Sequence, residues 1–528
     1  MNAMDIFGGA LAQHAADQPD AIALRFQHRT TSYAQFNANA NRVANALAGA
    51  GIPQGARIAY LGKNSDYAIE LIMGAAKAGV VFVPIIWRLA GPEIDYILND
   101  CGATMLFVEP LFAEHGRAAA ARGLPVILVD AVEPNTNAPI DPAWPCYSAW
   151  RDGAAPDAPT AHVTVNDVVV QLYTSGTTGF PKGVMLTHGN GTQFRGILQS
   201  ANIAWMTNEP GETVMLAMPY GHIAGAGGTL LAVHAGQQMV ILSEFDAGAV
   251  LETIENYRIR RLFLVPAALA ILLGHPRAAT TDFSSITSFS YGASPIPLDL
   301  LQQGLAVLKC GFVQMYGMTE TWGTVVALPP EDHGPDRLHV MKSAGRALPG
   351  VELRILDEAG NPLPAGTIGE VAIKSPSNMV GYWNKPDETA RTLSADGWLR
   401  TGDAGLLDDE GYLFIQDRMK DMIISGAENI YPAEVESAIY GHPAVADVAV
   451  IGVPDAAWGE AVKACIVLKP GEKADAESII AHARTRIAGF KCPKSIDFIN
   501  ELPRNPSGKI LRRQLREPYW AGRDRQIN

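Results

Sequence analysis

Residues 173–183 have the sequence Tyr-Thr-Ser-Gly-Thr-Thr-Gly-Phe-Pro-Lys-Gly and follow an apolar run at residues 168–172. The apolar run predicts a buried strand. The segment behind it crowds four Ser/Thr hydroxyls, three glycines and Lys182 into one turn. Glycines let backbone N–H groups close around an anion, hydroxyls add hydrogen bonds, and the lysine adds a positive charge. The segment therefore predicts a loop that binds a polyphosphate.

Two other interpretations of this loop can be weighed from the residues. A Walker A loop is excluded, because that pattern has glycine directly before the lysine and here Pro181 precedes Lys182. A flexible surface turn is the plain alternative, since hydroxyl-rich glycine turns are common. The length of the string favours phosphate binding.

Length and composition indicate a globular protein of more than one domain. The chain has 528 residues, 48% hydrophobic and 18% charged, which exceeds what one hydrophobic core usually supports. The net charge of −13 argues against a general nucleic-acid binder. Residues 418–528 hold 16 Lys/Arg and 14 Asp/Glu, a balance of +2, which leaves −15 for residues 1–417. A positive tail suits polyanionic substrates, and a solvated helix face explains it equally well.

Cysteine spacing and hydropathy bear on the cellular compartment. The five cysteines are scattered and show no zinc or redox spacing, which favours a reduced, cytoplasmic setting. We see no signal peptide at the start of the chain and no apolar run of the roughly 18 residues that a membrane helix needs. We expect no integral membrane segment. The sequence leaves a homodimer open.

From residue 57 onward the chain alternates strand-like and helix-like segments. Apolar runs at 58–61, 80–83, 104–108 and 126–129 predict strands. Asn64 is expected to cap a helix that runs to about Lys77, with Gly79 ending it and Pro84 closing the next strand. Strands separated by helices predict parallel sheets covered on both faces, with ligands at the carboxyl ends of the strands.

Near residue 417 the pattern changes. A dense charge run at 417–421 follows a β-like region at 397–415, and beyond it we expect helices at 432–440 and 476–487 with strands near 448–451 and 464–468. This is the size of a small α+β domain. We predict the α/β fold class, with a large N-terminal domain (1–417) of mostly parallel sheets sandwiched by helices. A small C-terminal domain (418–528) follows.

Five further segments carry recognisable patterns. They are Pro-Tyr-Gly-His (219–222), Gly-Ala-Ser (292–294), Gln-Met-Tyr-Gly-Met-Thr-Glu (314–320), Gly-Trp-Leu-Arg-Thr-Gly-Asp (397–403) and Arg-Asn-Pro-Ser-Gly-Lys-Ile (504–510). With residues 173–183 they resemble, in order, the motifs of the adenylate-forming superfamily. That superfamily contains acyl- and aryl-CoA ligases, luciferases and peptide-synthetase adenylation domains. The resemblance spans about residues 173–513.

The resemblance implies an ATP site in which Tyr316 stacks on adenine, Thr319 bonds the α-phosphate and Glu320 holds Mg²⁺ together with Thr174. A carboxylate with phosphate oxygens suits this hard cation. Asp403 would accept both ribose hydroxyls, and Arg418 would reach the ribose. The remaining implied ATP contacts are Ser175, Gly176, Thr177, Thr178, Gly179, Lys182, Gly292, Ala293, Ser294, Gln314, Met315, Gly317 and Lys509.

For the chemistry, the resemblance places Lys509 on the substrate carboxylate and the α-phosphate, where it offsets charge as pyrophosphate leaves. His222 would line the acyl site. This chain departs from the common pattern there, because Gly221 replaces an aromatic residue. The implied acyl pocket consists of His222, Ala226, Tyr291, Trp322 and Gly323.

The resemblance also implies a two-step reaction. A carboxylic acid and ATP give an acyl-adenylate and pyrophosphate, and the thiol of coenzyme A then attacks the acyl carbon. The small domain would swing about Lys420 between the steps. The loop with Ser425 and Gly426 would then enter the site in place of Lys509. We interpret the chain as an AMP-forming acyl-CoA ligase with a medium- or long-chain fatty acid as its acyl substrate.

Other functions remain to be weighed. Aryl- or sterol-side-chain-CoA ligases share these motifs. A stand-alone adenylation enzyme that loads a carrier protein is a less favoured alternative. A peptide-synthetase adenylation domain would have an amino-acid-binding aspartate soon after His222, where residues 224–228 are all small. Nothing here supports the oxygenation step of a luciferase. A non-enzymatic nucleotide-binding scaffold would be expected to lack Lys509 or Glu320, and both are present.

Overall fold

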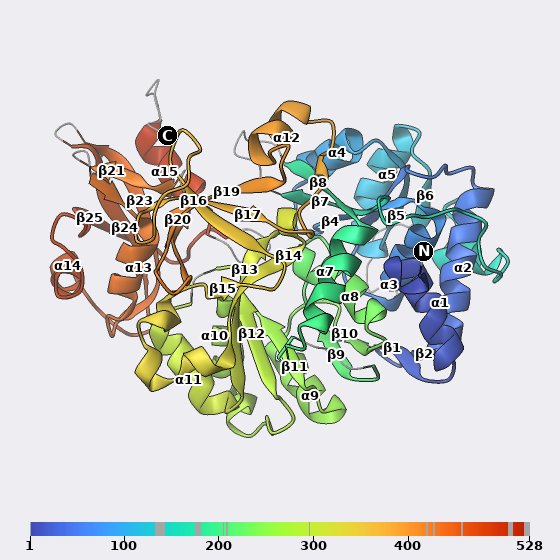
Figure 1. Cartoon of the computed structure of the whole chain (residues 1–528), viewed down its shortest axis with the longest axis horizontal. Coiled ribbons are helices and arrows are strands. Elements are labelled where there is room, and N and C mark those ends of the chain that lie inside the picture. Colours follow the sequence, from blue (N-terminus) through green and yellow to red (C-terminus); the bar gives the residue numbers. More distant parts are fainter. Residues whose placement is uncertain are drawn as a thin grey trace.

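The structure is a computed structural model. It describes residues 2–131, 143–174, 181–203, 205–206, 210–294, 296–418, 421–425, 428–455, 458–504 and 510–521, with only the backbone of residues 335, 418 and 429. Figure 1 shows two large α/β sheets occupying most of the molecule, with the C-terminal elements gathered at one end. No helix among the described residues combines the length and apolarity needed to cross a bilayer. All five cysteines are free.

A seven-stranded sheet contains the strand that precedes the hydroxyl-rich loop. Its order is β18-β8-β7-β4-β3-β5-β6, and the five strands from β7 to β6 run parallel. β8 and β18 extend it antiparallel. The strands are β3 (Arg57–Leu61), β4 (Val81–Ile85), β5 (Ala103–Val108), β6 (Val126–Leu128), β7 (Val168–Thr174), β8 (Lys182–Thr187) and β18 (Gly381–Tyr382). Helices α3 (Asp66–Ala78), α4 (Gly91–Asp100) and α5 (Ala113–Ala121) connect its parallel strands.

The strands predicted in this sheet are confirmed, and two local predictions are wrong. The N-cap of α3 is Ser65, whose hydroxyl accepts the Ala68 N–H, rather than Asn64. The Asn64 side chain instead donates to the backbone carbonyls of Met218 and Leu242. Pro84 does not close β4 but lies within it. β4 pairs with β7 only through Phe82, so a residue without an N–H is tolerated there.

A nine-stranded sheet has the order β15-β14-β13-β12-β11-β9-β10-β1-β2. Its six central strands, β13 to β1, are parallel, and the strands at both edges are antiparallel. The strands are β1 (Ile22–Phe26), β2 (Arg29–Ser32), β9 (Thr213–Leu216), β10 (Gln238–Ile241), β11 (Arg261–Leu264), β12 (Ser288–Gly292), β13 (Gly311–Met318), β14 (Gly323–Leu328) and β15 (Arg346–Ala347). Its connecting helices are α8 (Ile223–His234), α9 (Ala247–Tyr257), α10 (Pro266–Gly274) and α11 (Leu298–Leu308).

The two large sheets share one hydrophobic core. Helices α1 (Phe7–Asp17), α2 (Tyr33–Gly49), α3 and α8 contribute buried apolar side chains to it, together with strands of both sheets. Helix α7 (His188–Ser200) follows β8. Short helices α6 (Tyr147–Asp152) and α12 (Pro386–Thr392) complete this part of the chain. Helices therefore lie between the sheets, as the alternating pattern predicted.

A smaller antiparallel sheet, β16-β17-β19-β20, leads to the C-terminal unit. Its strands are β16 (Glu352–Leu356), β17 (Gly369–Lys374), β19 (Trp398–Leu407) and β20 (Leu413–Arg418). Beyond it lie β21 (Ile423–Ser425), β22 (Glu428–Ile430), β23 (Val445–Asp455), β24 (Gly459–Leu468), β25 (Ser495–Phe498), α13 (Pro432–Tyr440), α14 (Ala476–Arg484) and α15 (Arg512–Trp520). These elements form their own core. The predicted fold class is confirmed, and the boundary after residue 417 stays a prediction.

Candidate functional site

The hydroxyl-rich loop connects two antiparallel strands rather than a strand and a helix. Thr174 at the end of β7 pairs with Lys182 at the start of β8. The loop thus follows the carboxyl end of a parallel strand, as predicted, but it closes a hairpin. The expected contacts Ser175, Gly176, Thr177, Thr178 and Gly179 lie outside the described residues.

Tyr382, which the sequence analysis did not predict as a site residue, links Lys182 to Glu320. Lys182 forms an ion pair with Glu388 on α12, and its ammonium lies 5.1 Å from the centroid of the Tyr382 ring. The Tyr382 hydroxyl donates to Oε1 of Glu320 at 2.9 Å. Burial and the nearby Glu320 carboxylate raise the pKa of Tyr382, so its hydroxyl stays a donor. Nothing in the residues around Tyr382 distinguished it in sequence.

Glu320 is suited to a hard cation. Glu320 is 5% exposed. It follows Thr319 in the single turn 319–321, which comes directly after β13. Oε1 accepts the Tyr382 hydroxyl, and Oε2 accepts no hydrogen bond from the described part of the chain. The second oxygen therefore fits an Mg²⁺ ligand.

Tyr316 and Asp403 meet although 87 residues separate them. The Tyr316 hydroxyl donates to Oδ2 of Asp403 at 2.7 Å, which joins β13 of the large sheet to β19 of the small one. Asp403 is 6% exposed. Arg418 pairs with Asp403 in the β19–β20 ladder, so its backbone is adjacent. The residues expected at adenine and ribose are thus neighbours.

Two glycines in the predicted adenine segments have no room for a side chain. A Cβ on Gly292 would lie 2.2 Å from the Met315 carbonyl oxygen, and one on Gly317 would lie 1.7 Å from the Gly323 carbonyl oxygen. Gly292 pairs with Met315 where β12 and β13 run parallel. The segments 292–294 and 314–317 therefore converge at the carboxyl ends of two adjacent strands. Ala293 and Ser294 are exposed there, and Gln314 accepts a hydrogen bond from the Tyr291 hydroxyl at 3.2 Å.

The five residues predicted for the acyl pocket fall into two places. His222 precedes α8, Ala226 lies on α8, and Gly323 faces Ile223 of the same helix. Tyr291 lies apart from them, in a core shared with Phe312, and its hydroxyl contacts His333 at 3.0 Å. The structure does not bring Tyr291 to the α8 group.

Near α8, His222 is half-buried and Trp322 is buried. Burial lowers the pKa of His222 to about 4, so its ring is neutral at pH 7. Trp322 is 6% exposed and stacks on Phe7, with ring centroids 5.7 Å apart. A Cβ on Gly191 would come within 2.7 Å of the indole. Trp322 thus packs between α1 and α7.

The elements proposed to move are only partly described. Lys420, Gly426 and Lys509 lie outside the described residues. Ser425 ends β21 and pairs with Glu428 and Gly459. The segment with Lys509 is bounded by a bridge between Arg504 and Ile510. Asp417 accepts the Ala433 N–H at 2.8 Å, which connects β20 to the start of α13.

Comparison with known proteins agrees with this arrangement. The sequence profile of AMP-binding enzymes matches residues 11–383, and that of the AMP-binding enzyme C-terminal domain matches residues 434–509. The chain belongs to the AMP-binding enzyme family. Its relatives are acyl-CoA and acyl-carrier-protein ligases, so it is an AMP-forming acid–thiol ligase, and the CoA ligases of this family use ATP, Mg²⁺ and coenzyme A.

Family members similar to this chain differ in their acyl groups and acceptors. A fatty acid–[acyl-carrier-protein] ligase of Streptomyces coeruleorubidus is 41% identical over 98% of this chain and 96% of its own length. A feruloyl-CoA synthase of an Amycolatopsis species is 40% identical over 96% of this chain and 98% of its own. Among solved structures, ATP-bound MatB from Rhodopseudomonas palustris superposes with a TM-score of 0.87 at 32% identity. The match covers 98% of this chain and 99% of that one.

Proposed function

We propose that this AMP-forming ligase activates a fatty acid of medium or greater chain length. The neutral, half-buried His222 beside α8 carries the proposal, because a permanent charge there would demand a charged partner on the substrate. Residues 224–228 are small, and none of the four predicted pocket residues near α8 (His222, Ala226, Trp322 and Gly323) has a permanent charge. Such a surface suits an apolar chain.

We assign the ATP site to the residues that converge between the sheets. Tyr316 and Asp403 bind adenine and ribose, while Thr174 and Lys182 hold phosphate oxygens from the β7–β8 hairpin. The proposed metal ligands are Glu320 and Thr174, where Mg²⁺ would supply charge neutralisation of the phosphates. Thr319 bonds the α-phosphate, and Lys509 offsets charge as pyrophosphate leaves. These residues position the reactants and stabilise charge, which is most of what phosphoryl and adenylyl transfer asks of a protein.

The thiol acceptor has two candidates. Coenzyme A is the first, and an acyl-carrier protein is the second because the Streptomyces relative at 41% identity has a carrier protein in its name. Incubating enzyme, ATP and a fatty acid with either coenzyme A or a phosphopantetheinylated carrier protein distinguishes them by the thioester formed. We place the enzyme in the cytoplasm, on the grounds of its free cysteines. Native mass measurement would test the homodimer.

A substrate series should show rising catalytic efficiency with chain length. Each methylene buried adds about 0.8 kcal/mol, or roughly fourfold, until the pocket ends. Pyrophosphate release with saturated acids of increasing length should climb from short chains to a plateau at medium or greater length. Ferulate and a sterol-side-chain acid test the alternatives within the family. A preference for acetate, an amino acid or an aryl acid over every fatty acid would contradict the proposal.

The Tyr382→Phe variant should weaken Mg²⁺ binding about tenfold without unfolding the enzyme. The phenol donates to the proposed ligand Glu320 at 2.9 Å. Loss of such a supporting hydrogen bond typically costs 10–100-fold in metal affinity. Mg²⁺ titrations of pyrophosphate release measure the effect, and the control is Tyr33→Phe, at another buried tyrosine, whose hydroxyl donates to the Gln237 carbonyl. An unchanged Mg²⁺ requirement would show that Tyr382 serves packing alone.

A further inference from the structure

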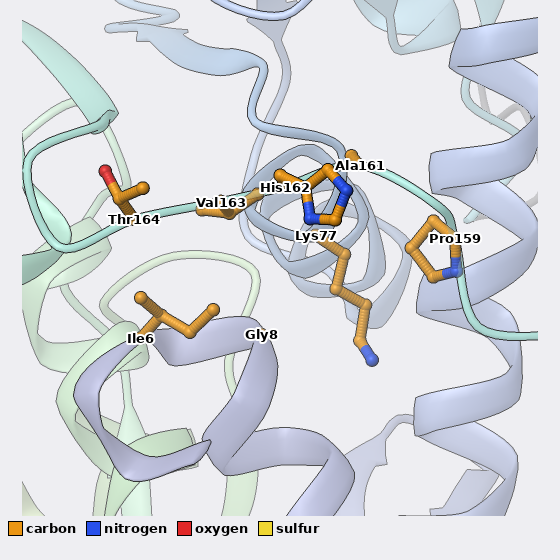
Figure 2. Close-up of a pocket in the computed structure, with 8 residues that line it drawn as sticks. All are labelled: Ile6, Gly8, Lys77, Pro159, Ala161, His162, Val163 and Thr164. Atoms are coloured by element: carbon orange, nitrogen blue, oxygen red, sulfur yellow. The ribbon is translucent and has the colours of Figure 1, made fainter. Parts of the chain in front are cut away.

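A cavity lies beside the N-terminal helices, away from the proposed ATP site. It has a volume of about 400 Å³ and is formed by the start of α1, the last turn of α3 and the extended segment 159–164 that precedes β7 (Figure 2). The ATP site is at the opposite, carboxyl end of β7. The residues that line the cavity are Ile6, Gly8, Lys77, Pro159, Ala161, His162, Val163 and Thr164.

The cavity is mostly apolar and open to solvent at its rim. Ile6, Pro159, Ala161 and Val163 supply aliphatic surface. On the segment 159–164, Ala161, His162 and Thr164 are exposed and Val163 is buried. A volume of this size falls in the range of small-molecule sites, so it can admit an acyl chain.

Lys77 is held in place within this cavity. A Cβ on Gly8 would lie 2.8 Å from Cγ of Lys77, so α1 packs directly against the lysine stem. The Nζ donates to Oδ1 of Asn37 on α2 at 2.7 Å. Figure 2 shows the side chain extended into the space between α1 and the 159–164 segment. The lysine is therefore ordered by three helices rather than mobile on the surface.

The Lys77 ammonium donates to an amide oxygen rather than to a carboxylate. Among the described residues, no carboxylate lies within 4.0 Å of its Nζ, and His162 is the other titratable group that lines the cavity. Burial lowers the pKa of Lys77 to about 8. The C-terminal end of α3 favours the cation, but by less than burial disfavours it. Near pH 8 about half of this amine is uncharged, whereas an ordinary lysine with a pKa of about 10.4 is almost wholly protonated.

We propose that Lys77 is a site of Nε-acylation by activated acyl groups of the kind that this enzyme produces. The uncharged amine attacks the carbonyl carbon of an acyl thioester or acyl-adenylate. The new C–N bond replaces the C–S bond to coenzyme A or the C–O bond to AMP, and the amine proton leaves with the departing group. The acylated nitrogen keeps one N–H for Asn37. The acyl chain would rest on the apolar wall, and the half-buried cation would be replaced by a neutral amide.

The inference rests on acyl activation by the family but not on the identity of the acyl substrate. One arm of the test supplies pre-made octanoyl-CoA to the full-length enzyme, so it does not depend on the enzyme's own turnover. A second arm supplies octanoic acid and ATP without coenzyme A, so that only the adenylate can donate. Peptide mapping by mass spectrometry follows each lysine against time at several pH values.

Lys309 is the matched comparator in the same digest, because it also ends a helix but is exposed. Near pH 8 an amine of pKa about 8 has on the order of a hundredfold more free base than an ordinary lysine. Part of that gain is lost because a less basic amine is a weaker nucleophile. We expect Lys77 to be acylated at least about tenfold faster than Lys309, with the rate reaching half its plateau near pH 8.

Each labelling result either supports acylation of Lys77 or argues against it. Lys77→Arg should remove the label at this position and leave pyrophosphate release unchanged, because Lys77 has no part in the ATP site. Labelling in the thioester arm alone, or in the adenylate arm alone, identifies the donor. Equal labelling of Lys77 and Lys309, or a rate on Lys77 that rises only above pH 10, would overturn the proposal. Labelling in the first arm with no pyrophosphate released in the second would count against acyl activation instead.

Discussion

Replacing Lys509 with alanine is expected to slow acyl-adenylate formation by about 10²–10³-fold, the usual cost of removing one preorganised charge donor. The proposed role confines this lysine to the first step, where negative charge builds on the α-phosphate. Thioester formation from a pre-made acyl-adenylate should therefore remain near its normal rate. Both half-reactions can be measured separately, by pyrophosphate release and by acyl-CoA formation.

The control for Lys509→Ala is Lys473→Ala, an exposed lysine of the same C-terminal unit. That variant should leave both half-reactions unchanged. If Lys509→Ala slowed both half-reactions equally, the lysine would instead contribute to folding of the segment bounded by Arg504 and Ile510.

Glu320→Gln is expected to lower pyrophosphate release by on the order of 10²-fold or more at millimolar Mg²⁺. The substitution keeps the shape of the side chain and an oxygen for the Tyr382 hydroxyl, but it removes the charge that a hard cation requires. Its effect should exceed that of Tyr382→Phe, since losing a hydrogen-bond partner of a metal ligand typically lowers metal affinity or activity 10–100-fold. Raising the Mg²⁺ concentration should restore part of the activity.

Glu331→Gln is the matched control for this variant, because Glu331 is exposed on the same segment of chain. Thermal unfolding of Glu320→Gln should stay close to that of the parent, since the buried carboxylate already carries a desolvation cost. Full activity of Glu320→Gln at low Mg²⁺ would show that Glu320 is not a metal ligand.

Local sequence patterns determined much of the architecture. Short apolar runs predicted β3 to β7, because a strand buried on both faces must be apolar throughout. Gly79 marked the end of α3 correctly, since its φ of +67° favours glycine. The N-cap at Ser65 was missed because Asn64 and Ser65 are equally good caps, and only contacts with distant carbonyls decide between them. Pro84 was wrongly predicted to end β4 for a similar reason. The free-energy cost of a proline in a strand depends on whether the neighbouring strand needs its missing N–H.

The candidate site, like the fold, was predicted from the sequence only in part. The sequence determined which residue types could serve ATP, since glycines, hydroxyls, a lysine and carboxylates follow one another in short segments of the chain. Only the tertiary structure decided that Tyr316 bonds Asp403 across two sheets, that Tyr382 links Lys182 to Glu320, and that Tyr291 lies apart from His222. Hydropathy and residue spacing report the neighbours of a residue along the chain. Contacts across 62 or 87 residues arise when separate strands pair and pack, and no local pattern encodes that pairing.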